Sequence, residues 1–352
     1  METKEARLAA IPKAIIFDEE GDRFFILDQT KLPTEEIIEE QTHVEQVYDS
    51  IYQLKVRGAP AIGIAGAYGL LISLRDATGM ALADFVALAH KNADYLNSSR
   101  PTAVNLSWAL NRMVTIAEAF PSDGTAEALY AQLRAEAIAI HASDIETCRL
   151  IGEHGAALID EGAGVMTLCN AGALATGGIG TALAPMYVAW ADGKRFKAYS
   201  NETRPLLQGA RITSWELHHF GVDVTLIADS VASYLMKLGR VDLIIVGADR
   251  VANNGDAANK IGTSSLAINA KYYGVPFYIA CPYSTIDTHS KSGADIVVEE
   301  RGADEVIYVK GQQIAPADVK VFNPAFDVTD HKLIAGFITE KGIIRPPYNF
   351  SA

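Results

Sequence analysis

The chain has 352 residues, of which 49% are hydrophobic and 21% charged, a balance typical of a soluble globular protein with room for two domains. Its formal net charge of -13 argues against nucleic acid and against an anionic membrane surface as partners, because both attract basic patches. The three cysteines, Cys148, Cys169 and Cys281, have no regular spacing, so we expect free thiols in a reducing cytoplasm.

The first part of the chain, residues 1–125, is predicted to be a smaller, mainly α-helical domain with a β-hairpin. Residues 14–28 indicate two short strands around a Glu-Gly-Asp turn. Helical patterns follow in residues 34–54, 59–74, 82–96 and 104–120. The second of these is strongly apolar but too short to span a bilayer, so we expect a buried helix packed through small residues. A run of turn residues, 121–125, is the predicted linker.

The second part, residues 126–352, is predicted to be a Rossmann-like α/β domain. A long helical pattern over 126–159 comes first. The predicted strands are 165–169, 196–200, 222–228, 243–248, 276–281 and 305–308, and the predicted helices are 179–190, 205–220, 231–238, 261–273 and 330–341. Apolar strands that alternate with helices indicate a parallel sheet covered on both faces. Asp330 is the expected cap of the last helix.

Two candidate catalytic residues follow strands of this predicted sheet. Asp249 comes directly after the apolar run 243–248, where partial desolvation would raise the pKa of an acid and suit it to proton transfer. A turn cap or an arginine pair would equally explain its position. Cys169 ends the first strand before a glycine-containing turn, yet cysteine is also among the most buried residue types.

Candidate binding residues lie in the loops. Arg57 precedes Gly58 and Ala59, whose backbone N–H groups open a predicted helix, and this combination is typical of an anion site. An ordinary buried helix beside a surface arginine is the alternative. Gln208 lies near a helix start after the second strand. Asn259 and Lys260 form a polar pair that we place at the start of the 261–273 helix.

Metal and cofactor motifs are not found. The histidines show no HExxH spacing, and no GxGxxG follows a predicted strand. The sequence therefore predicts no metal site and no nicotinamide or nucleotide cofactor.

Several long motifs in one order resemble the methylthioribose-1-phosphate isomerase family over nearly the whole chain. They are Val56–Gly63, Ser99–Thr102, Thr167–Gly172, Glu202–Arg211 and Gly247–Asp256. Regulatory subunits of the translation initiation factor 2B exchange factor share the second-domain fold without this chemistry. The resemblance implies a cytoplasmic homodimeric enzyme of methionine salvage that binds a small sugar 1-phosphate.

The resemblance also implies residue roles. Asp249 would be the proton donor, and Cys169 would assist the transition state. Substrate-binding positions are matched by Arg57, Gly58, Ala59, Arg100, Gln208, Asn259 and Lys260. The basic side chains among them would supply the local positive field that the chain otherwise lacks. The implied site is a cleft between the two domains.

The implied reaction converts 5-methylthioribose 1-phosphate to 5-methylthioribulose 1-phosphate. Because carbon 1 carries the phosphate, ring opening requires protonation of the ring oxygen, and hydrogen then moves from carbon 2 to carbon 1 by an enolate or a hydride shift. Three alternatives stay open: isomerisation of 5-deoxyribose 1-phosphate, isomerisation of ribose 1,5-bisphosphate, and a non-catalytic regulatory subunit of the same fold.

Overall fold

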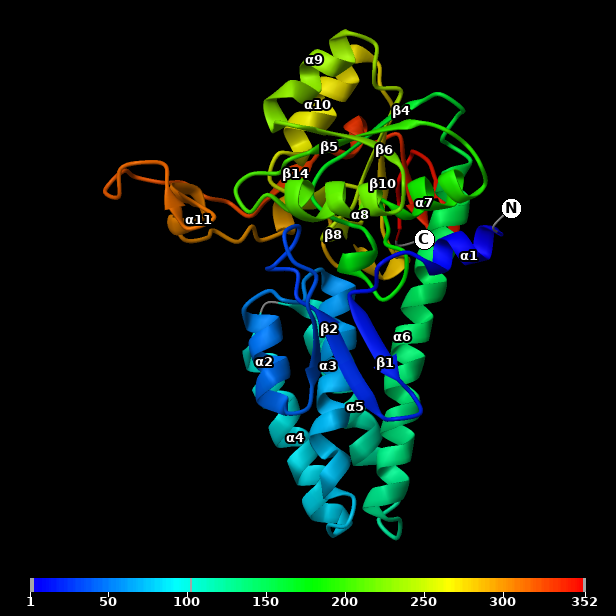
Figure 1. Cartoon of the computed structure of the whole chain (residues 1–352), viewed down its shortest axis with the longest axis vertical. Coiled ribbons are helices and arrows are strands. Elements are labelled where there is room, and N and C mark those ends of the chain that lie inside the picture. The colour runs from blue at the N-terminus through cyan, green and yellow to red at the C-terminus, as the bar shows by residue number, and fades with distance from the viewer. Residues whose placement is uncertain (1–2, 102, 351–352) are drawn as a thin grey trace. The chain divides into compact units, whose positions relative to one another are not determined.

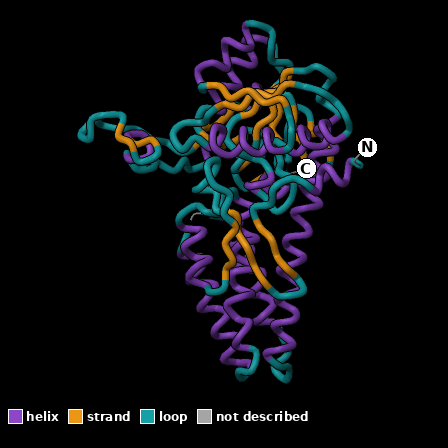
Figure 2. The backbone as a smooth tube through the Cα atoms, viewed as in Figure 1, coloured by secondary structure: helices purple, strands orange, loops and turns teal. Residues whose placement is uncertain are grey.

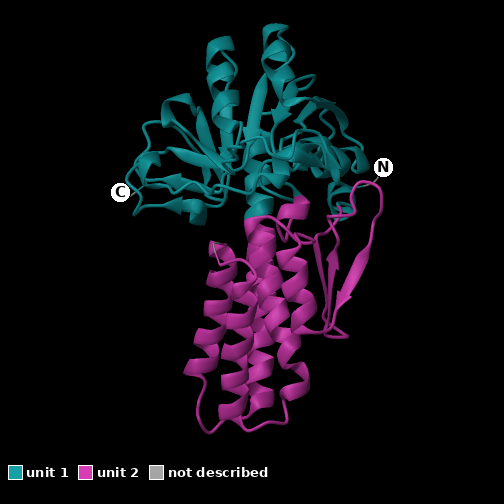
Figure 3. Ribbon diagram, turned by 90° about the vertical axis from the view of Figure 1, so that its left-hand side faces the viewer, with its two compact units in different colours: residues 1–11, 147–172, 179–352 teal, residues 12–146, 173–178 magenta. Residues whose placement is uncertain are grey.

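The computed structural model describes residues 3–101 and 103–350, so Thr102 of the Ser99–Thr102 motif and the outer ends of both predicted domains lie outside the described residues. Contacts divide the chain into two compact units (Figure 3). Unit 1 comprises residues 3–11, 147–172 and 179–350, and unit 2 comprises residues 12–146 and 173–178 within the described range. The helix α6 (Ala126–Ala156) contributes residues 126–146 to unit 2 and the remainder to unit 1.

Unit 2 is a bundle of helices with a small antiparallel sheet (Figures 1 and 2). Its helices besides α6 are α2 (Val44–Tyr52), α3 (Ala59–Leu74), α4 (Leu82–Ser98) and α5 (Val104–Ala119), with short 3₁₀ turns at Arg75–Ala77 and Ala173–Ala175. Its strands are β1 (Ile15–Asp18), β2 (Arg23–Leu27) and β3 (Ile38–Gln41). The predicted hairpin is confirmed. The helical stretch expected over 34–54 is confirmed only in α2. Its first part is wrong, because β3 pairs with β2 and satisfies its second edge.

Helix α3 is the buried helix that its small residues predict. A Cβ atom built on Gly63 would lie 2.8 Å from the carbonyl oxygen of Asn105, and one on Gly69 would lie 2.6 Å from Val47. Glycine therefore allows α5 and α2 to approach α3 closely. On another side of α3, the Tyr68 ring stacks on Phe17 of β1 with ring centroids 4.3 Å apart.

Unit 1 is built on a seven-stranded sheet, counted over the described residues, in the order β16-β15-β10-β7-β4-β5-β6. These strands are β4 (Gly164–Thr167), β5 (Lys197–Asn201), β6 (Asp223–Ile227), β7 (Leu243–Val246), β10 (Phe277–Ala280), β15 (Gly336–Thr339) and β16 (Gly342–Ile344). Every neighbouring pair is parallel except β15 with β16. The predicted Rossmann-like parallel sheet is confirmed.

Helices cover the two faces of this sheet (Figure 1). In that view α9 (Ala232–Lys237) and α10 (Thr263–Tyr273) lie above the strands, and α7 (Ala184–Ala191) and α8 (Ser214–His219) lie below them. The remaining helices of unit 1 are α1 (Lys4–Ala9) and α11 (Asp304–Ile307). None of the described helices combines the length and the apolar character needed to cross a bilayer.

A second, four-stranded sheet in unit 1 has the order β11-β8-β9-β14. Its strands are β8 (Arg250–Ala252), β9 (Ala257–Lys260), β11 (Ile286–Asp287) and β14 (Phe326–Thr329). A separate two-stranded pair consists of β12 (Tyr308–Val309) and β13 (Gln312–Gln313).

Two predicted elements near the C-terminus are wrong. Residues 330–341 form a 3₁₀ turn at His331–Leu333 followed by β15, although Asp330 does cap that turn through the backbone N–H of Lys332. The spacing of apolar residues there fits a helix, but all four residues of β15 are buried and pair with β10. The strand expected at 305–308 is mostly the short helix α11, since a short apolar run fits either structure.

Candidate functional site

The candidate catalytic residues follow two adjacent central strands of the main sheet. Met166 of β4 pairs with Ile244 of β7. The chain continues from β4 to β5 and from β7 to β10, so the two connections lead towards opposite edges of the sheet. This is the topological switch point, where open α/β sheets place ligands beyond the carboxyl ends of their strands. Cys169 follows β4 and Asp249 follows β7. The two loops are packed together, because a Cβ atom on Gly247 would lie 2.8 Å from the Cβ of Ala171.

Cys169 has an unusual backbone conformation. Its φ is +67°, in the left-handed region that non-glycine residues rarely adopt. Its N–H donates to Thr203 Oγ1 at 2.8 Å, and its carbonyl oxygen accepts from Thr213 Oγ1 at 2.6 Å. The side chain is half-buried, whereas Cys148 and Cys281 are buried. Cys169 is therefore the most accessible of the three thiols.

The other thiol at a strand end, Cys281, is unsuited to chemistry. It follows β10 as Cys169 follows β4. Complete burial and, to a lesser degree, the nearby Glu340 carboxylate raise the pKa of the Cys281 thiol to about 12. A thiol in this state is inert at neutral pH.

Asp249 immediately precedes a β-hairpin. Its N–H donates to the carbonyl oxygen of Ala258 at 2.9 Å, just before β8 pairs with β9. The Asp249 side chain is exposed, so the partial desolvation expected at the end of an apolar strand is not seen. An Asn254-Gly255 turn joins β8 to β9, with Gly255 at a φ of +89°.

Asn259 and Lys260 lie on strand β9 and not at a helix start, which corrects their predicted position. The hairpin brings them close to Asp249, and both side chains are buried. Asn259 Nδ2 donates to Thr263 Oγ1 at 3.0 Å. Lys260 Nζ donates to the carbonyl oxygen of Ala325 at 2.9 Å and lies 4.5 Å from the centre of the Phe326 ring. A buried ammonium group in such surroundings favours an anionic ligand.

Gln208 is placed by a π-helix, Gly209–Thr213, which continues into α8. A Cβ atom on Gly209 would lie 1.7 Å from the carbonyl oxygen of Asn201, so only glycine lets this turn pack on the end of β5. The Gln208 side chain is 6% exposed, and its Oε1 has no hydrogen-bond partner among the described residues. A buried acceptor in this state fits a ligand hydroxyl.

The other four predicted residues belong to unit 2. Gly58 is the N-cap of α3 with a φ of +91°, and a Cβ atom there would lie 2.4 Å from the carbonyl oxygen of Ala175. Arg57 is half-buried and Ala59 is exposed at the first turn of α3, as an anion site requires. Arg100 is half-buried between α4 and α5. The Gly63–Asn105 approach puts the N-terminal turns of α3 and α5 side by side within this unit.

One group of described residues has ligand atoms at metal-binding separations: Asp256, Asp330 and His331. Asp256 already accepts hydrogen bonds from the backbone N–H groups of Gly293 and His331, from Asn254 Nδ2 and from His331 Nδ1. Burial would raise the pKa of Asp256, but these bonds outweigh it and lower the pKa to about 2. The cluster ties the hairpin turn to the start of the 3₁₀ turn at His331.

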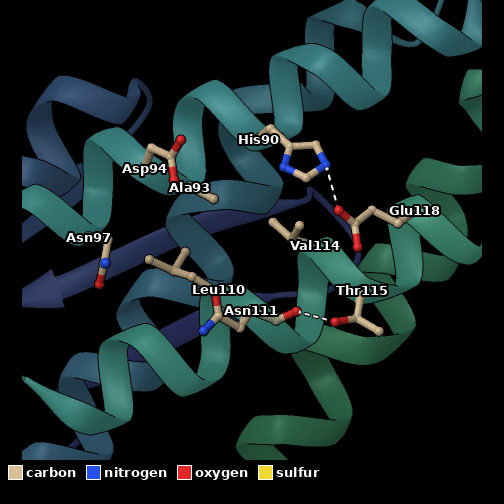
Figure 4. Close-up of a pocket in the computed structure, with 9 residues that line it drawn as sticks. All are labelled: His90, Ala93, Asp94, Asn97, Leu110, Asn111, Val114, Thr115 and Glu118. Atoms are coloured by element: carbon tan, nitrogen blue, oxygen red, sulfur yellow. Dashed lines mark hydrogen bonds and ion pairs between the residues drawn. The ribbon is translucent and has the colours of Figure 1, made fainter.

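A cavity of about 310 Å³ lies between α4 and α5 in unit 2 (Figure 4). It is lined by His90, Ala93, Asp94, Asn97, Leu110, Asn111, Val114, Thr115 and Glu118. His90 Nε2 approaches Glu118 Oε1 at 3.3 Å. None of the predicted site residues lines this cavity, so it is separate from the candidate site.

Sequence reasoning missed the residues that support Cys169. Thr203 lies inside a quoted motif, but nothing in the motif marks its hydroxyl as a partner of Cys169. Thr213 and the fully buried Glu216 fall in a stretch that fits an ordinary amphipathic helix. Their roles depend on contacts between segments far apart in the chain, which periodicity does not encode.

Unit 1 is thus a Rossmann-type α/β structure whose candidate active site lies at the switch point. A family model described as "Initiation factor 2 subunit family" matches residues 55–346. The chain belongs to this family and is a homologue of proteins named methylthioribose-1-phosphate isomerase.

Relatives similar to this chain include proteins with two different isomerase names. A Bacillus cytotoxicus methylthioribose-1-phosphate isomerase is 48% identical over 339 residues, 96% of each chain. A Moorella thermoacetica 5-deoxyribose 1-phosphate isomerase is 51% identical over 323 residues, 92% of each chain. The crystal structure of 5-methylthioribose 1-phosphate isomerase from Pyrococcus horikoshii OT3 has 42% identity and a TM-score of 0.93, covering 97% of this chain and 95% of that chain.

Proposed function

We propose that this protein is an aldose–ketose isomerase that converts 5-methylthioribose 1-phosphate to 5-methylthioribulose 1-phosphate in methionine salvage. The observation that carries the proposal is the placement of Cys169 and Asp249 after β4 and β7, the strands that flank the switch point. An acid and an accessible thiol at this position match what the reaction needs. Identity of 48% to a named isomerase over 96% of the chain supports the assignment.

Ring opening is the first chemical task, and we assign it to Asp249. The phosphate on carbon 1 leaves no anomeric hydroxyl to release, so the ring oxygen must accept a proton from a positioned acid. Asp249 is exposed within its unit, so a substrate has access to its carboxyl group. Bound substrate would then displace water from the Asp249 carboxyl group, and this desolvation favours the protonated form of Asp249.

Hydrogen transfer from carbon 2 to carbon 1 is the second task, and we assign its assistance to Cys169. The half-buried thiol would act as a base on the enolate route or as a polar neighbour of a migrating hydride. A substrate carrying deuterium on carbon 2 separates the two routes. Loss of the label to solvent supports the enolate, and complete retention in the product supports the hydride shift.

Substrate binding falls to the remaining predicted residues. In unit 2, Arg57 and Arg100 would supply positive charge for an anionic group, together with the N–H groups of Gly58 and Ala59. In unit 1, Lys260 would supply positive charge. The open acceptor of Gln208 supports a bond from a sugar hydroxyl, as its buried Oε1 has no partner among the described residues. Asn259 would bind beside Lys260, its neighbour on β9.

The substituent that the substrate carries on carbon 5 is identified by comparing turnover of three sugar phosphates. The 51% identical 5-deoxyribose 1-phosphate isomerase favours that sugar as the second candidate. We expect the highest kcat/KM with 5-methylthioribose 1-phosphate, when it is compared with 5-deoxyribose 1-phosphate and ribose 1,5-bisphosphate. A higher value for the deoxy sugar would reassign the substrate, and no turnover on any of the three would favour a regulatory subunit.

We also propose a cytoplasmic homodimer formed through unit 1. Exposed apolar side chains on α9 and α10, among them Tyr234 and Tyr272, support an interface there. The three free cysteines are consistent with a reducing compartment. Light scattering at micromolar concentration should give twice the mass of the chain, and a monomer would contradict the dimer.

A further inference from the structure

The backbone of Cys169 is held at both of its polar groups by threonine hydroxyls. Its N–H donates to Thr203 Oγ1, and its carbonyl oxygen accepts from Thr213 Oγ1. Neither bond belongs to the sheet, because β4 ends at Thr167. The left-handed conformation is unfavourable for a non-glycine residue and persists only where its surroundings fix it. These two hydroxyls provide that fixation.

Thr203 is itself fixed in an unfavourable conformation. Its φ is +65°, which is rare for a β-branched residue. Its N–H donates to Asp229 Oδ1 at 2.8 Å, and its hydroxyl donates to the carbonyl oxygen of Asn201 at 2.9 Å. Because the hydroxyl hydrogen is used in this way, Thr203 Oγ1 presents a lone pair to the Cys169 N–H.

The Thr213 hydroxyl donates to Cys169, whereas the Thr203 hydroxyl accepts from it. Asn170 Nδ2 donates to Thr213 Oγ1 at 3.1 Å, so the hydroxyl hydrogen is directed to the carbonyl oxygen of Cys169. Asn170 Nδ2 also donates to Glu216 Oε1 at 2.8 Å, and Tyr187 donates to Glu216 Oε2 at 2.9 Å. The fully buried Glu216 carboxylate thereby fixes the orientation of the Asn170 amide.

Tyr187 keeps its proton in this network. Complete burial raises the pKa of its phenol well above the ordinary value, and the neighbouring Glu216 carboxylate raises it further. The phenol is therefore a constant donor to Glu216 across the working pH range. Tyr187 and Asn170 both donate to Glu216, and Asn170 also donates to Thr213, which in turn donates to Cys169.

We propose that Thr203 and Thr213 are positioning residues that fix Cys169 in its left-handed conformation for hydrogen transfer, and that Glu216 orients Thr213 through Asn170. The inference rests on the proposed function, because it assigns the thiol a role in turnover. These residues act through Cys169 and not on the sugar. We call the two hydrogen bonds that join Thr203 and Thr213 to the Cys169 backbone the clamp. Releasing the clamp should therefore lower kcat while KM for the sugar phosphate stays unchanged.

The test replaces each hydroxyl by a methyl group of similar size and then restores it. Thr203→Val and Thr213→Val remove the bonds, and Thr203→Ser and Thr213→Ser restore them. Thr339→Val is the matched control, because Thr339 is also fully buried in unit 1 and its hydroxyl donates to the carbonyl oxygen of Gly342 at 3.0 Å, in the turn between β15 and β16. Amide hydrogen exchange of residues 168–171 reports the clamp independently of activity.

We expect both valine variants to exchange these amides faster and to lose about 10-fold or more in kcat, with KM within about 2-fold of the wild type. The serine variants should recover most of the loss, and Thr339→Val should change neither measurement. Faster exchange with an unchanged kcat would overturn the positioning role, and so would unchanged exchange. If the wild type turns over no sugar phosphate, the proposed function fails, while the exchange data still decide whether the clamp exists.

Discussion

Asp249 is the residue to which the proposed reaction assigns the first proton transfer. Replacing it by asparagine keeps the size and the backbone bond to Ala258 but removes the proton donor. We expect Asp249→Asn to fold normally and to lose about 10²–10⁴-fold in kcat, the usual effect of removing a positioned acid. Steady-state kinetics and circular dichroism measure the two parts of this prediction.

The control for Asp249→Asn is the same substitution at Asp223, an exposed aspartate at the opposite end of a sheet strand, the start of β6. It forms only a surface ion pair with Lys197 at 3.6 Å, and such pairs contribute little. Asp223→Asn should retain wild-type activity. Wild-type turnover in Asp249→Asn would remove Asp249 from the mechanism.

Gly58 combines a proposed binding role with a strict steric requirement. A side chain there would have to adopt a φ of +91° and would collide with the backbone of Ala175. Gly58→Ala should therefore lower the midpoint of thermal unfolding and reduce activity. Gly79 in the same unit has open space around its Cα, so Gly79→Ala should be neutral or slightly stabilising. Equal melting temperatures for the two variants would contradict this steric account.

At the scale of elements, the β8–β9 hairpin is anchored through the Asp256 carboxylate. Its folded-state pKa of about 2 lies below the ordinary 3.8, so it stabilises the fold above about pH 4 and this contribution is lost as the pH falls towards 2. We expect the free energy of unfolding of the wild type to fall over this window. Asp256→Asn should be less stable at neutral pH and should show a smaller decline, measured by denaturant titration at several pH values.

The elements that could be predicted from the sequence are those whose own pattern decides their structure. Strands β4 and β7 are mainly apolar runs, and so the positions of Cys169 and Asp249 after them could be predicted as well. Strands β15 and β3 could not be predicted from the sequence, because their strand structure depends on pairing with β10 and β2. The strand position of Asn259 and Lys260 has the same cause, as β9 pairs with both β8 and β14.

At the scale of the whole molecule, the predicted domain boundary at 125/126 falls at the start of α6. Residues 126–146 are counted with unit 2, and Leu129, Leu133 and Ala137 among them are completely buried. Tyr130 and Arg134 also bind Asp22 at 2.7 and 2.6 Å. A fragment that ends at 125 would expose this core.

We therefore expect a fragment of residues 12–146 to unfold cooperatively, and a fragment of residues 12–125 to show little cooperative unfolding. Circular dichroism during heating compares the two. A cooperative transition of similar midpoint in the shorter fragment would support the boundary predicted at 125/126.

The short segment 173–178 gives unit 2 a further property, which concerns its synthesis. This segment packs against Gly58 through Ala175, accepts a bond from Gln29 at Leu174, and joins Gly177 to His141 and Asp144. It is synthesised about 30 residues after the last of those partners, Asp144, by which time β4 of the other unit has also been made. At a synthesis rate of about 5–20 residues per second, the helices of unit 2 are made on the order of seconds before this segment can contact them. The nascent chain thus carries an incomplete N-terminal bundle until this segment has been made.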